Sequence, residues 1–173
     1  MKLDFRHAVQ ADIPQLLALV TAAYRGDASR QSWTTEADLL DGSRTDAELL
    51  AADIDAADSL VLLGEHAGKL IACAHLAMQP DAGYFGMFSV CPRLQGQGIG
   101  KQMLLEAERI VREDFRKPLM RMQVIDLREE LIAFYQRRGY HPTGQYSPFP
   151  YGDTRFGKPR RKDLRFAILE KPL

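Results

Sequence analysis

The feature that most constrains the fold is a cluster of three glycines at the start of a long amphipathic segment. Gly96, Gly98 and Gly100 follow the apolar run "GYFGMFSV", which is typical of a strand. The apolar positions after them recur at helical spacing, namely Ile99, Met103, Leu104, Ala107, Ile110 and Val111. A glycine turn between a strand and a helix is a favourable place for an anion, because backbone N–H groups converge there at the positive end of the helix dipole. The sequence therefore predicts a bound phosphate at this turn.

Two well-known phosphate-binding patterns do not fit the turn. A dinucleotide-binding G-x-G-x-x-G that begins at Gly96 would need glycine where Lys101 stands. A Walker A loop would need glycine at Gln95 and Ser or Thr at Gln102. The spacing therefore argues against both a Rossmann fold and a P-loop.

The rest of the chain alternates strands and helices without an internal repeat. Strands are expected at 3–9, at 83–90, at 119–126, at 140–146, at 163–170, and as a hairpin within 59–79 that turns at 66–69. Helices are expected at 12–24, 99–111 and 128–139, and as two short helices separated by Gly42 within 32–54. Thr45 and Glu48 suggest a capping box for the second short helix, and Gly139 is expected to end the last one.

Composition favours a small-molecule partner. The 173 residues are 46% hydrophobic, which is ample for a packed core. Lys plus Arg and Asp plus Glu both count 23, so no positive field indicates nucleic acid or a membrane surface as a partner. With no signal-peptide core and no apolar run near the roughly 20 residues that span a bilayer, we expect a cytoplasmic protein. Cys73 and Cys91 are expected to be reduced thiols, and no metal site is expected.

Two motifs in the same order resemble one family. Gln95, Gly98 and Gly100 match Q-x-x-G-x-G, and "AFYQRRGY", Ala133 to Tyr140, is similar to an F-Y-x-x-x-G-F/Y block. Together they resemble the GCN5-related N-acetyltransferase (GNAT) superfamily. The resemblance implies one α+β domain over residues 1–173, with helices on both faces of a mostly antiparallel sheet of about seven strands. It implies that the fourth and fifth strands, 83–90 and 119–126, splay apart and that acetyl-CoA is the cosubstrate.

The resemblance also implies how acetyl-CoA is held. The main chain of Phe88 and Val90 is expected to bind the pantetheine arm, with the Val90 N–H aimed at the thioester oxygen. The full set of expected cofactor-binding residues is Phe88, Ser89, Val90, Gln95, Gly96, Gln97, Gly98, Ile99, Gly100, Lys101 and Arg128. Arg128 and Leu131 stand where family members often carry Asn and Ala, so Arg128 either contacts the cofactor or is a solvated residue at a helix start.

The catalytic residues follow from the same resemblance, less completely. Tyr135 matches the tyrosine whose hydroxyl points at the CoA sulfur, which makes it the expected general acid. The base stays open between Glu36, Asp126 and a chain of waters. His75 is expected to be a strand residue with a satisfied hydrogen bond.

The acceptor is expected to be the primary amine of a small molecule that attacks acetyl-CoA directly in a ternary complex. Segments 33–44 and 147–162 are expected to wall its site, with Trp33, Phe149, Tyr151 and Arg155 as candidate contacts. The basic residues of the second segment favour a carboxylate-bearing acceptor, such as an amino acid, over a polyamine.

Two alternatives to this enzyme remain open. The same fold could serve as a non-catalytic CoA-binding sensor or assembly module, although Tyr135 argues for turnover. A nucleic-acid-binding module has only the basic loop in its favour. Exposed edges near the last two strands make a homodimer an expectation as well.

Overall fold

The computed structural model describes the backbone of residues 1–173 and the burial of each of them except Gly26. Its main sheet has seven strands in the order β1, β3, β4, β5, β6, β9, β7. Their bounds are β1 Asp4–His7, β3 Ser59–His66, β4 Lys69–Met78, β5 Gly83–Val90, β6 Leu119–Ile125, β9 Arg165–Pro172 and β7 His141–Pro148. Neighbouring strands are antiparallel except for β5 and β6, which are parallel. The predicted α+β class, with a mostly antiparallel seven-stranded sheet, is confirmed.

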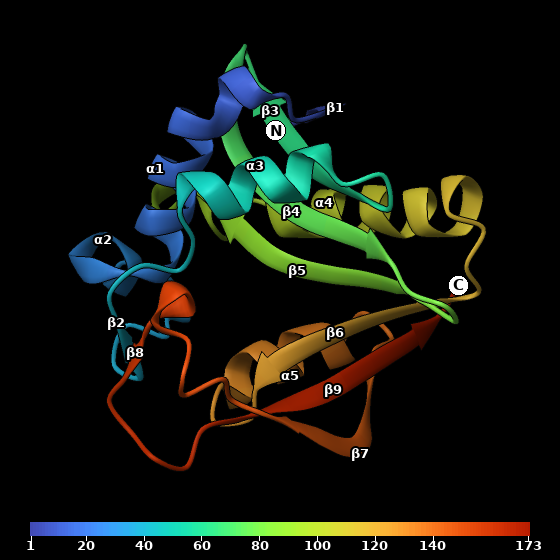
Figure 1. Ribbon diagram of the computed structural model, residues 1–173. Coiled ribbons are helices and arrows are strands. Elements are labelled where there is room, and N and C mark those ends of the chain that lie inside the picture. The colour runs from blue at the N-terminus through green and yellow to red at the C-terminus, as the bar shows by residue number, and fades with distance from the viewer.

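Helices cover both faces of this sheet (Figure 1). One face carries α1 (Ile13–Tyr24) and α3 (Ala47–Asp55), and the other carries α4 (Ile99–Arg109) and α5 (Glu129–Gln136). A single π-helical turn, Ile110–Asp114, continues α4. The apolar positions that predicted α4 are buried, Met103 and Ala107 completely so, in a core shared with α5. No helix in the described part of the chain is long and apolar enough to cross a bilayer.

The sheet opens between β5 and β6, the fourth and fifth strands of the sequence prediction. These strands pair only where Gly83–Phe85 runs beside Met120–Met122. Beyond that point they diverge (Figure 1), and β6 pairs along its whole length with β9 instead. The second half of β5 is therefore left without a strand partner on the β6 side, as the family resemblance implied.

A β-bulge shapes the open half of β5. Cys73 of β4 lies opposite Ser89 and His75 opposite Gly86, so the residue between them on β4 faces two residues on β5. One of the two, Met87, has a φ of 49°, in the left-handed region.

The ladder also sets the direction of the Val90 backbone. Beyond the bulge, the Cys91 N–H donates to the Ile71 carbonyl at 2.8 Å. Hydrogen-bonded and non-hydrogen-bonded pairs alternate in an antiparallel ladder, so the next pair, Val90 with Ala72, is non-hydrogen-bonded. The Val90 N–H consequently points away from β4, toward the side that β6 has left.

Two local predictions before α3 are wrong. The N-cap of α3 is Asp46, whose carboxylate accepts the Leu49 N–H at 2.8 Å, and Thr45 is buried instead of capping. Gly42 follows a two-residue strand, β2 (Leu40–Asp41), where the sequence predicted a short helix.

Long-range pairing explains that second error. β2 pairs with β8 (Lys158–Pro159), which lies more than a hundred residues later in the chain. The short helix of this region, α2 (Gly26–Arg30), lies before residue 32, where the predicted helical pair begins. Local sequence could not show that segment 147–162 folds back onto residues 39–41, because the pairing is tertiary.

The two edges of the main sheet are β1 and β7. Residues 141–146 of β7 are exposed, so this edge is open to pairing. The homodimer expected from the last two strands stays a prediction.

Candidate active site

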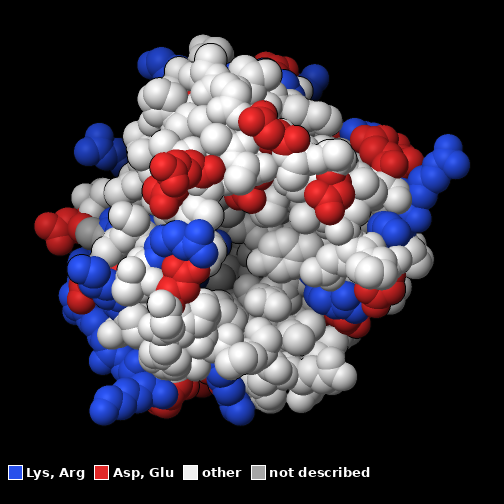
Figure 2. Space-filling view, in the orientation of Figure 1, with Lys and Arg blue, Asp and Glu red and all other residues white. Residues whose placement is uncertain are grey.

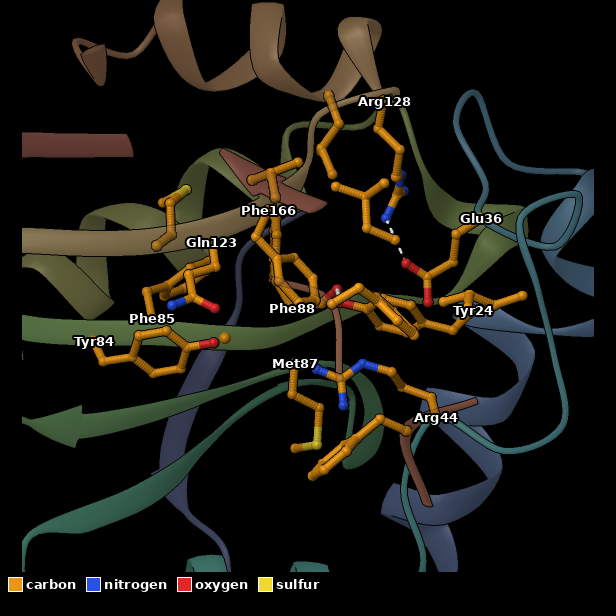
Figure 3. Close-up of a pocket in the computed structure, with 18 of the residues that line it drawn as sticks. Tyr24, Glu36, Arg44, Tyr84, Phe85, Met87, Phe88, Gln123, Arg128 and Phe166 are labelled. Carbon is orange, nitrogen blue, oxygen red and sulfur yellow. Dashed lines mark hydrogen bonds and ion pairs between the residues drawn. The ribbon is translucent and has the colours of Figure 1, made fainter. Parts of the chain in front are cut away.

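Two cavities meet where β5 and β6 diverge. The glycine cavity, of about 440 Å³, is lined by Ala23, Tyr24, Trp33, Thr34, Phe88, Val90, Gln95, Gly96, Gly98, Ile99, Gly100, Lys101, Arg128, Leu131, Phe134, Tyr135, Arg137 and Arg138. The aromatic cavity, of about 260 Å³, is lined by Tyr24, Glu36, Leu40, Arg44, Tyr84, Phe85, Gly86, Met87, Phe88, Met122, Gln123, Val124, Ile125, Arg128, Leu131, Tyr135, Phe149, Pro150, Phe156 and Phe166 (Figure 3). Their common residues are Tyr24, Phe88, Arg128, Leu131 and Tyr135. A molecule in one cavity can therefore reach a molecule in the other.

The glycine turn presents open backbone to the glycine cavity. Gly96 and Gly98 have φ values of 80° and 79°, and Gly98 is the N-cap of α4. No atom lies within 4 Å of a Cβ built at either position, so the cavity side of the turn is empty space. The Gln95 side chain anchors the turn by donating to the Val90 carbonyl at 3.3 Å. This arrangement suits an anion at the helix N-terminus.

Basic side chains add to this positive end of α4. Lys101, Arg137 and Arg138 all line the glycine cavity. The Arg138 guanidinium lies 3.5 Å from the centroid of the Phe134 ring, and its Nε atom is buried without a hydrogen-bond partner. Phosphate oxygens are the acceptors that such groups bind.

Tyr135 stands at the junction of the two cavities. Its ring is 4% exposed and packs edge-on against Phe134 and Tyr140, at centroid distances of 5.4 and 5.8 Å. Its hydroxyl makes no hydrogen bond with any described residue. Burial raises the pKa of Tyr135, so the hydroxyl keeps its proton at neutral pH.

Glu36 lies in the wall of the aromatic cavity, between two arginines. Its carboxylate forms an ion pair with Arg25 and a second with Arg128, whose Nη1 is 3.2 Å away. All three side chains are nearly buried. The triad carries a net charge of +1 and ties α1 to the start of α5.

Arg44 enters the aromatic cavity from the loop before α3 (Figure 3). Its guanidinium carbon is 5.2 Å from the centroid of the Tyr24 ring. The guanidinium makes no hydrogen bond or ion pair with the described residues. A cation without a counter-ion therefore lines this cavity.

Tyr84 and Gln123 also line the aromatic cavity, one from β5 and one from β6 (Figure 3). The Tyr84 ring lies across Gly86, since a Cβ on Gly86 would come within 2.6 Å of the Tyr84 Cε1. Burial raises the pKa of Tyr84, so its hydroxyl is a donor at neutral pH. Neither side chain makes a hydrogen bond within the part of the chain that the structure describes.

A comparison with known families identifies the chain. The model of the acetyltransferase (GNAT) family matches residues 19–140, a stretch that contains both the glycine turn and Tyr135. The chain belongs to the GNAT family. It is an N-acetyltransferase with acetyl-CoA as its cosubstrate, and the glycine cavity fits that cosubstrate through its open turn and its basic side chains.

Relatives and solved structures agree with this assignment. The S-(2-succino)cysteine N-acetyltransferase of Bacillus subtilis (strain 168) is 31% identical over 154 residues, which are 84% of this chain and 88% of the relative. The ribosomal-protein-S18-alanine N-acetyltransferase of Escherichia coli superposes with a TM-score of 0.69 at 16% identity, over 99% of this chain and 94% of that one. A GNAT acetyltransferase of Elizabethkingia anophelis, solved with acetyl-CoA bound, gives a TM-score of 0.62 at 18% identity over 79% of this chain and 89% of that one. At these identities the two structures show the shared GNAT fold.

Most of the residues expected to bind the cofactor line the glycine cavity. The exceptions are Ser89 and Gln97. The Ser89 side chain is buried and donates to the Met87 carbonyl at 3.2 Å, because alternate residues of a strand face opposite sides. Gln97 is exposed to solvent. Arg128 lines both cavities and is bound to Glu36, so it is not a solvated residue.

Neither carboxylate suggested as a base offers an unpaired oxygen within the two cavities, although the Oδ1 of Asp126 is buried elsewhere without a hydrogen-bond partner. Both oxygens of Glu36 are held by arginines. Asp126 lines neither cavity, and its Oδ2 accepts from Arg165 at 2.6 Å. Asp126 turns away because it follows β6 and packs toward the start of β9. The role of either residue as the base stays a prediction.

His75 is the strand residue that the sequence predicted. Its Nε2 lies 3.0 Å from the Ser59 hydroxyl, and the ring lines neither cavity. Burial lowers the pKa of His75, although the nearby Asp53 carboxylate opposes this effect.

The four residues predicted to contact the acceptor do not line one common cavity. Phe149 lines the aromatic cavity, but Trp33 lines the glycine cavity, where its ring is 5.5 Å from that of Phe134. Tyr151 and Arg155 line neither cavity. Both are exposed, and the Tyr151 hydroxyl accepts the Leu164 N–H at 2.8 Å. The sequence placed these side chains in a wall segment but could not show which way each one points.

The three arginines of the basic loop are paired with carboxylates. Lys and Arg gather on the side of the molecule that carries α2, β2 and β8, while the middle of the same face is hollowed and largely uncharged (Figure 2). The ion pairs of the loop are Arg155 with Asp153 at 2.5 Å, Arg160 with Asp41 at 2.6 Å and Arg161 with Asp163 at 2.7 Å. The unpaired positive charge of the aromatic cavity is thus on Arg44, which sequence reasoning missed because it reads as an ordinary polar loop residue.

Proposed function

We propose that the protein acetylates the primary amine of a small carboxylate-bearing molecule, such as an amino acid, by direct attack in a ternary complex. One observation carries the proposal: the aromatic cavity meets the glycine cavity at Tyr135 and carries more cationic than anionic side chains. Arg44 and Arg128 line it against Glu36, which a further arginine also neutralises. The relative from Bacillus subtilis, named for an amino acid derivative, supports the same substrate class.

In this proposal the glycine cavity holds and orients the cosubstrate, which supplies an activated acetyl thioester. The N–H groups of the glycine turn and the Lys101 ammonium bind the pyrophosphate. Phe88 and Val90 offer main-chain groups to the pantetheine arm. The direction of the Val90 N–H, away from β4, supports its role as donor to the thioester oxygen, where negative charge develops during attack.

Tyr135 then stabilises the departing sulfur. Its hydroxyl has no partner among the described residues and borders both cavities. The pKa of an ordinary thiol is about 8.5, below the raised pKa of this buried phenol. Tyr135 therefore acts mainly by donating a hydrogen bond to the developing thiolate, and proton transfer is secondary.

The amine proton leaves to water in this scheme. Glu36 is the only carboxylate among the described residues that line either cavity, and arginines hold both of its oxygens. No histidine lines these walls in the described chain. We expect the acceptor to react as the neutral amine, so the rate at fixed acceptor concentration rises with pH until the amine is deprotonated.

The test is a panel of amines assayed by free-thiol detection of released CoA. The panel holds S-(2-succino)cysteine, several α-amino acids, their carboxamides and spermidine. Carboxylate-bearing amines are expected to react fastest. A clear preference for spermidine would overturn the carboxylate class. No thiol release with any amine, despite tight acetyl-CoA binding, would favour a non-catalytic CoA-binding module.

A further inference from the structure

Besides Tyr135 at the junction of the two cavities, three polar side chains of the aromatic cavity have no hydrogen-bond partner in the described chain: Arg44, Tyr84 and Gln123. We propose that they form a carboxylate subsite, in which Arg44 binds a carboxylate of the acceptor and thereby determines specificity. This inference rests on the proposed function and assigns its substrate recognition to particular residues. The sequence comparisons name no residue for this role.

The charges around Arg44 leave its guanidinium available. The carboxylates whose charge acts on Arg44 are Glu36 and Asp53. Glu36 is occupied by two arginines, and Asp53 lies 3.7 Å from the ring of His75. Within the described residues Arg44 has no ion-pair partner, and its guanidinium carbon lies 5.2 Å from the centroid of the Tyr24 ring. A partly desolvated cation of this kind is stabilised by an incoming anion.

Tyr84 and Gln123 extend the same subsite across the opening of the sheet. Tyr84 comes from β5 and Gln123 from β6, at positions close to where the two strands part. In Figure 3 the Arg44 guanidinium and the Tyr84 hydroxyl point toward the same part of the cavity, and Gln123 lies beside Tyr84. A hydroxyl and an amide beside a guanidinium provide mainly donors, as a carboxylate requires.

The rest of the cavity lining narrows the chemical class of the acceptor further. It is mostly apolar and includes Phe85, Met87, Met122, Phe149, Phe156 and Phe166. An apolar wall weakens the competition of water for the Arg44 guanidinium and strengthens a two-pronged contact with a carboxylate. The geometry points to an acceptor with a carboxylate at Arg44 and an apolar body against the aromatic side chains. A polyamine would meet repulsion from Arg44 and gain nothing from the apolar wall.

The experiment combines one substitution, at Arg44, with one change in the acceptor, from a carboxylate to a carboxamide. kcat/KM is measured for wild type and Arg44→Gln with L-phenylalanine and with L-phenylalaninamide, and then with the other amino acids of the panel and their carboxamides. Arg44→Gln is expected to lower kcat/KM for the carboxylate on the order of 100-fold, because a buried charge pair is lost. For the carboxamide the expected loss is less than about threefold. For each acceptor, kcat/KM of the variant is divided by that of wild type. This ratio does not depend on the different amine pKa values of the two acceptors.

Two further variants keep the test specific. Tyr84→Phe removes one hydroxyl and is expected to lower kcat/KM for the carboxylate about tenfold. Arg161→Gln removes an exposed arginine that pairs with Asp163 and lines neither cavity, so it is expected to leave both acceptors unchanged. The affinity for acetyl-CoA, measured by calorimetry, is expected to stay within about twofold in all three variants, which shows that they fold.

The outcomes separate this inference from the proposed function. Equal losses for carboxylate and carboxamide in Arg44→Gln, or no loss for either, would overturn the carboxylate subsite while the proposed N-acetylation stands. A wild-type protein that releases no thiol with any amine would overturn both. A selective loss for the carboxylate supports both.

Discussion

The glycine cavity and the aromatic cavity differ in how the chain builds them. The glycine turn is a contiguous stretch, residues 95–101, whose binding groups are mainly backbone N–H groups at one helix end. The aromatic cavity takes its polar groups from separate segments: Glu36 and Arg44 before α3, Tyr84 from β5, Gln123 from β6 and Arg128 before α5. A site made from the backbone of one contiguous stretch can be predicted from the sequence. A site made from side chains far apart in the chain depends on the packing of the whole fold.

The walls of the aromatic cavity are tied together by one buried cation. Arg25 follows α1, and its Nη2 donates to the Phe156 carbonyl at 2.9 Å. The same guanidinium binds Glu36, which in turn binds Arg128. Arg25, Glu36, Arg128 and the Phe156 carbonyl are thereby held in one network, and Arg128 connects this network to the glycine cavity.

The largest expected effect lies at the junction of the two cavities. Tyr135→Phe removes the hydroxyl that both cavities share and is expected to lower kcat about 100-fold. Acetyl-CoA affinity should stay within about twofold, because the ring remains in place. Steady-state kinetics and calorimetry measure the two quantities. An unchanged kcat would remove the acid role of Tyr135.

The same residue predicts the pH profile. Because burial raises the pKa of Tyr135, its proton is retained at and above the ordinary tyrosine value, and no loss of activity from its ionisation is expected below about pH 10. The raised pKa of Tyr24, about 12, has the same consequence. Activity should therefore rise with the neutral fraction of the acceptor amine and then level off, and the midpoint should move when an acceptor with a different amine pKa is used.

The next effect tests the network that supports the aromatic cavity. Glu36→Gln leaves Arg25 and Arg128 buried without their counter-ion and is expected to lower the free energy of unfolding by about 3 kcal/mol. Urea denaturation measures the change. Asp163→Asn, which breaks the exposed pair with Arg161, is the control and should change stability little. A stable Glu36→Gln protein that has lost turnover would instead restore Glu36 as the base.

A smaller effect is expected at the glycine turn. Gly98→Ala forces a Cβ into a left-handed position with φ 79°, and the strain is expected to weaken acetyl-CoA binding about tenfold. Gly68→Ala is a matched control, since its φ is 72° in the β3–β4 turn, away from both cavities. Both variants should lose similar stability, and only the first should lose affinity. Equal acetyl-CoA affinity in the two proteins would contradict the role of the turn.

The smallest effect is expected from a substitution at Gly86, which lies against the Tyr84 ring. Gly86→Ala places a Cβ 2.6 Å from the Tyr84 ring and should raise the KM for a carboxylate acceptor about fivefold by displacing the hydroxyl. Acetyl-CoA binding should not change, because Gly86 does not line the glycine cavity. Gly152→Ala, with open space around its Cβ, is the control. A rise in the KM for acetyl-CoA instead would show that the two cavities are not independent at this point.

The sequence by itself determined the features that have a local physical cause. Apolar patterns predicted α4 and most of the main strands, because burial of one face dictates where apolar residues recur. The exposed strand β7 has no such pattern. The Q-x-x-G-x-G turn and the block around Tyr135 indicated the family and its cosubstrate, since the turn needs glycine at particular backbone angles. These predictions did not require knowledge of which segments meet.

Tertiary structure alone decided the arrangement of the aromatic cavity. The pairing of β2 with β8 overrode a helical interpretation of residues 32–41, and folding placed Glu36, a candidate base, between Arg25 and Arg128. Arg155 and Tyr151 point away from the aromatic cavity, while Arg44 points into it. The physical reason is that side-chain direction and counter-ion distance depend on segments brought together only by folding, and no spacing along the chain records them.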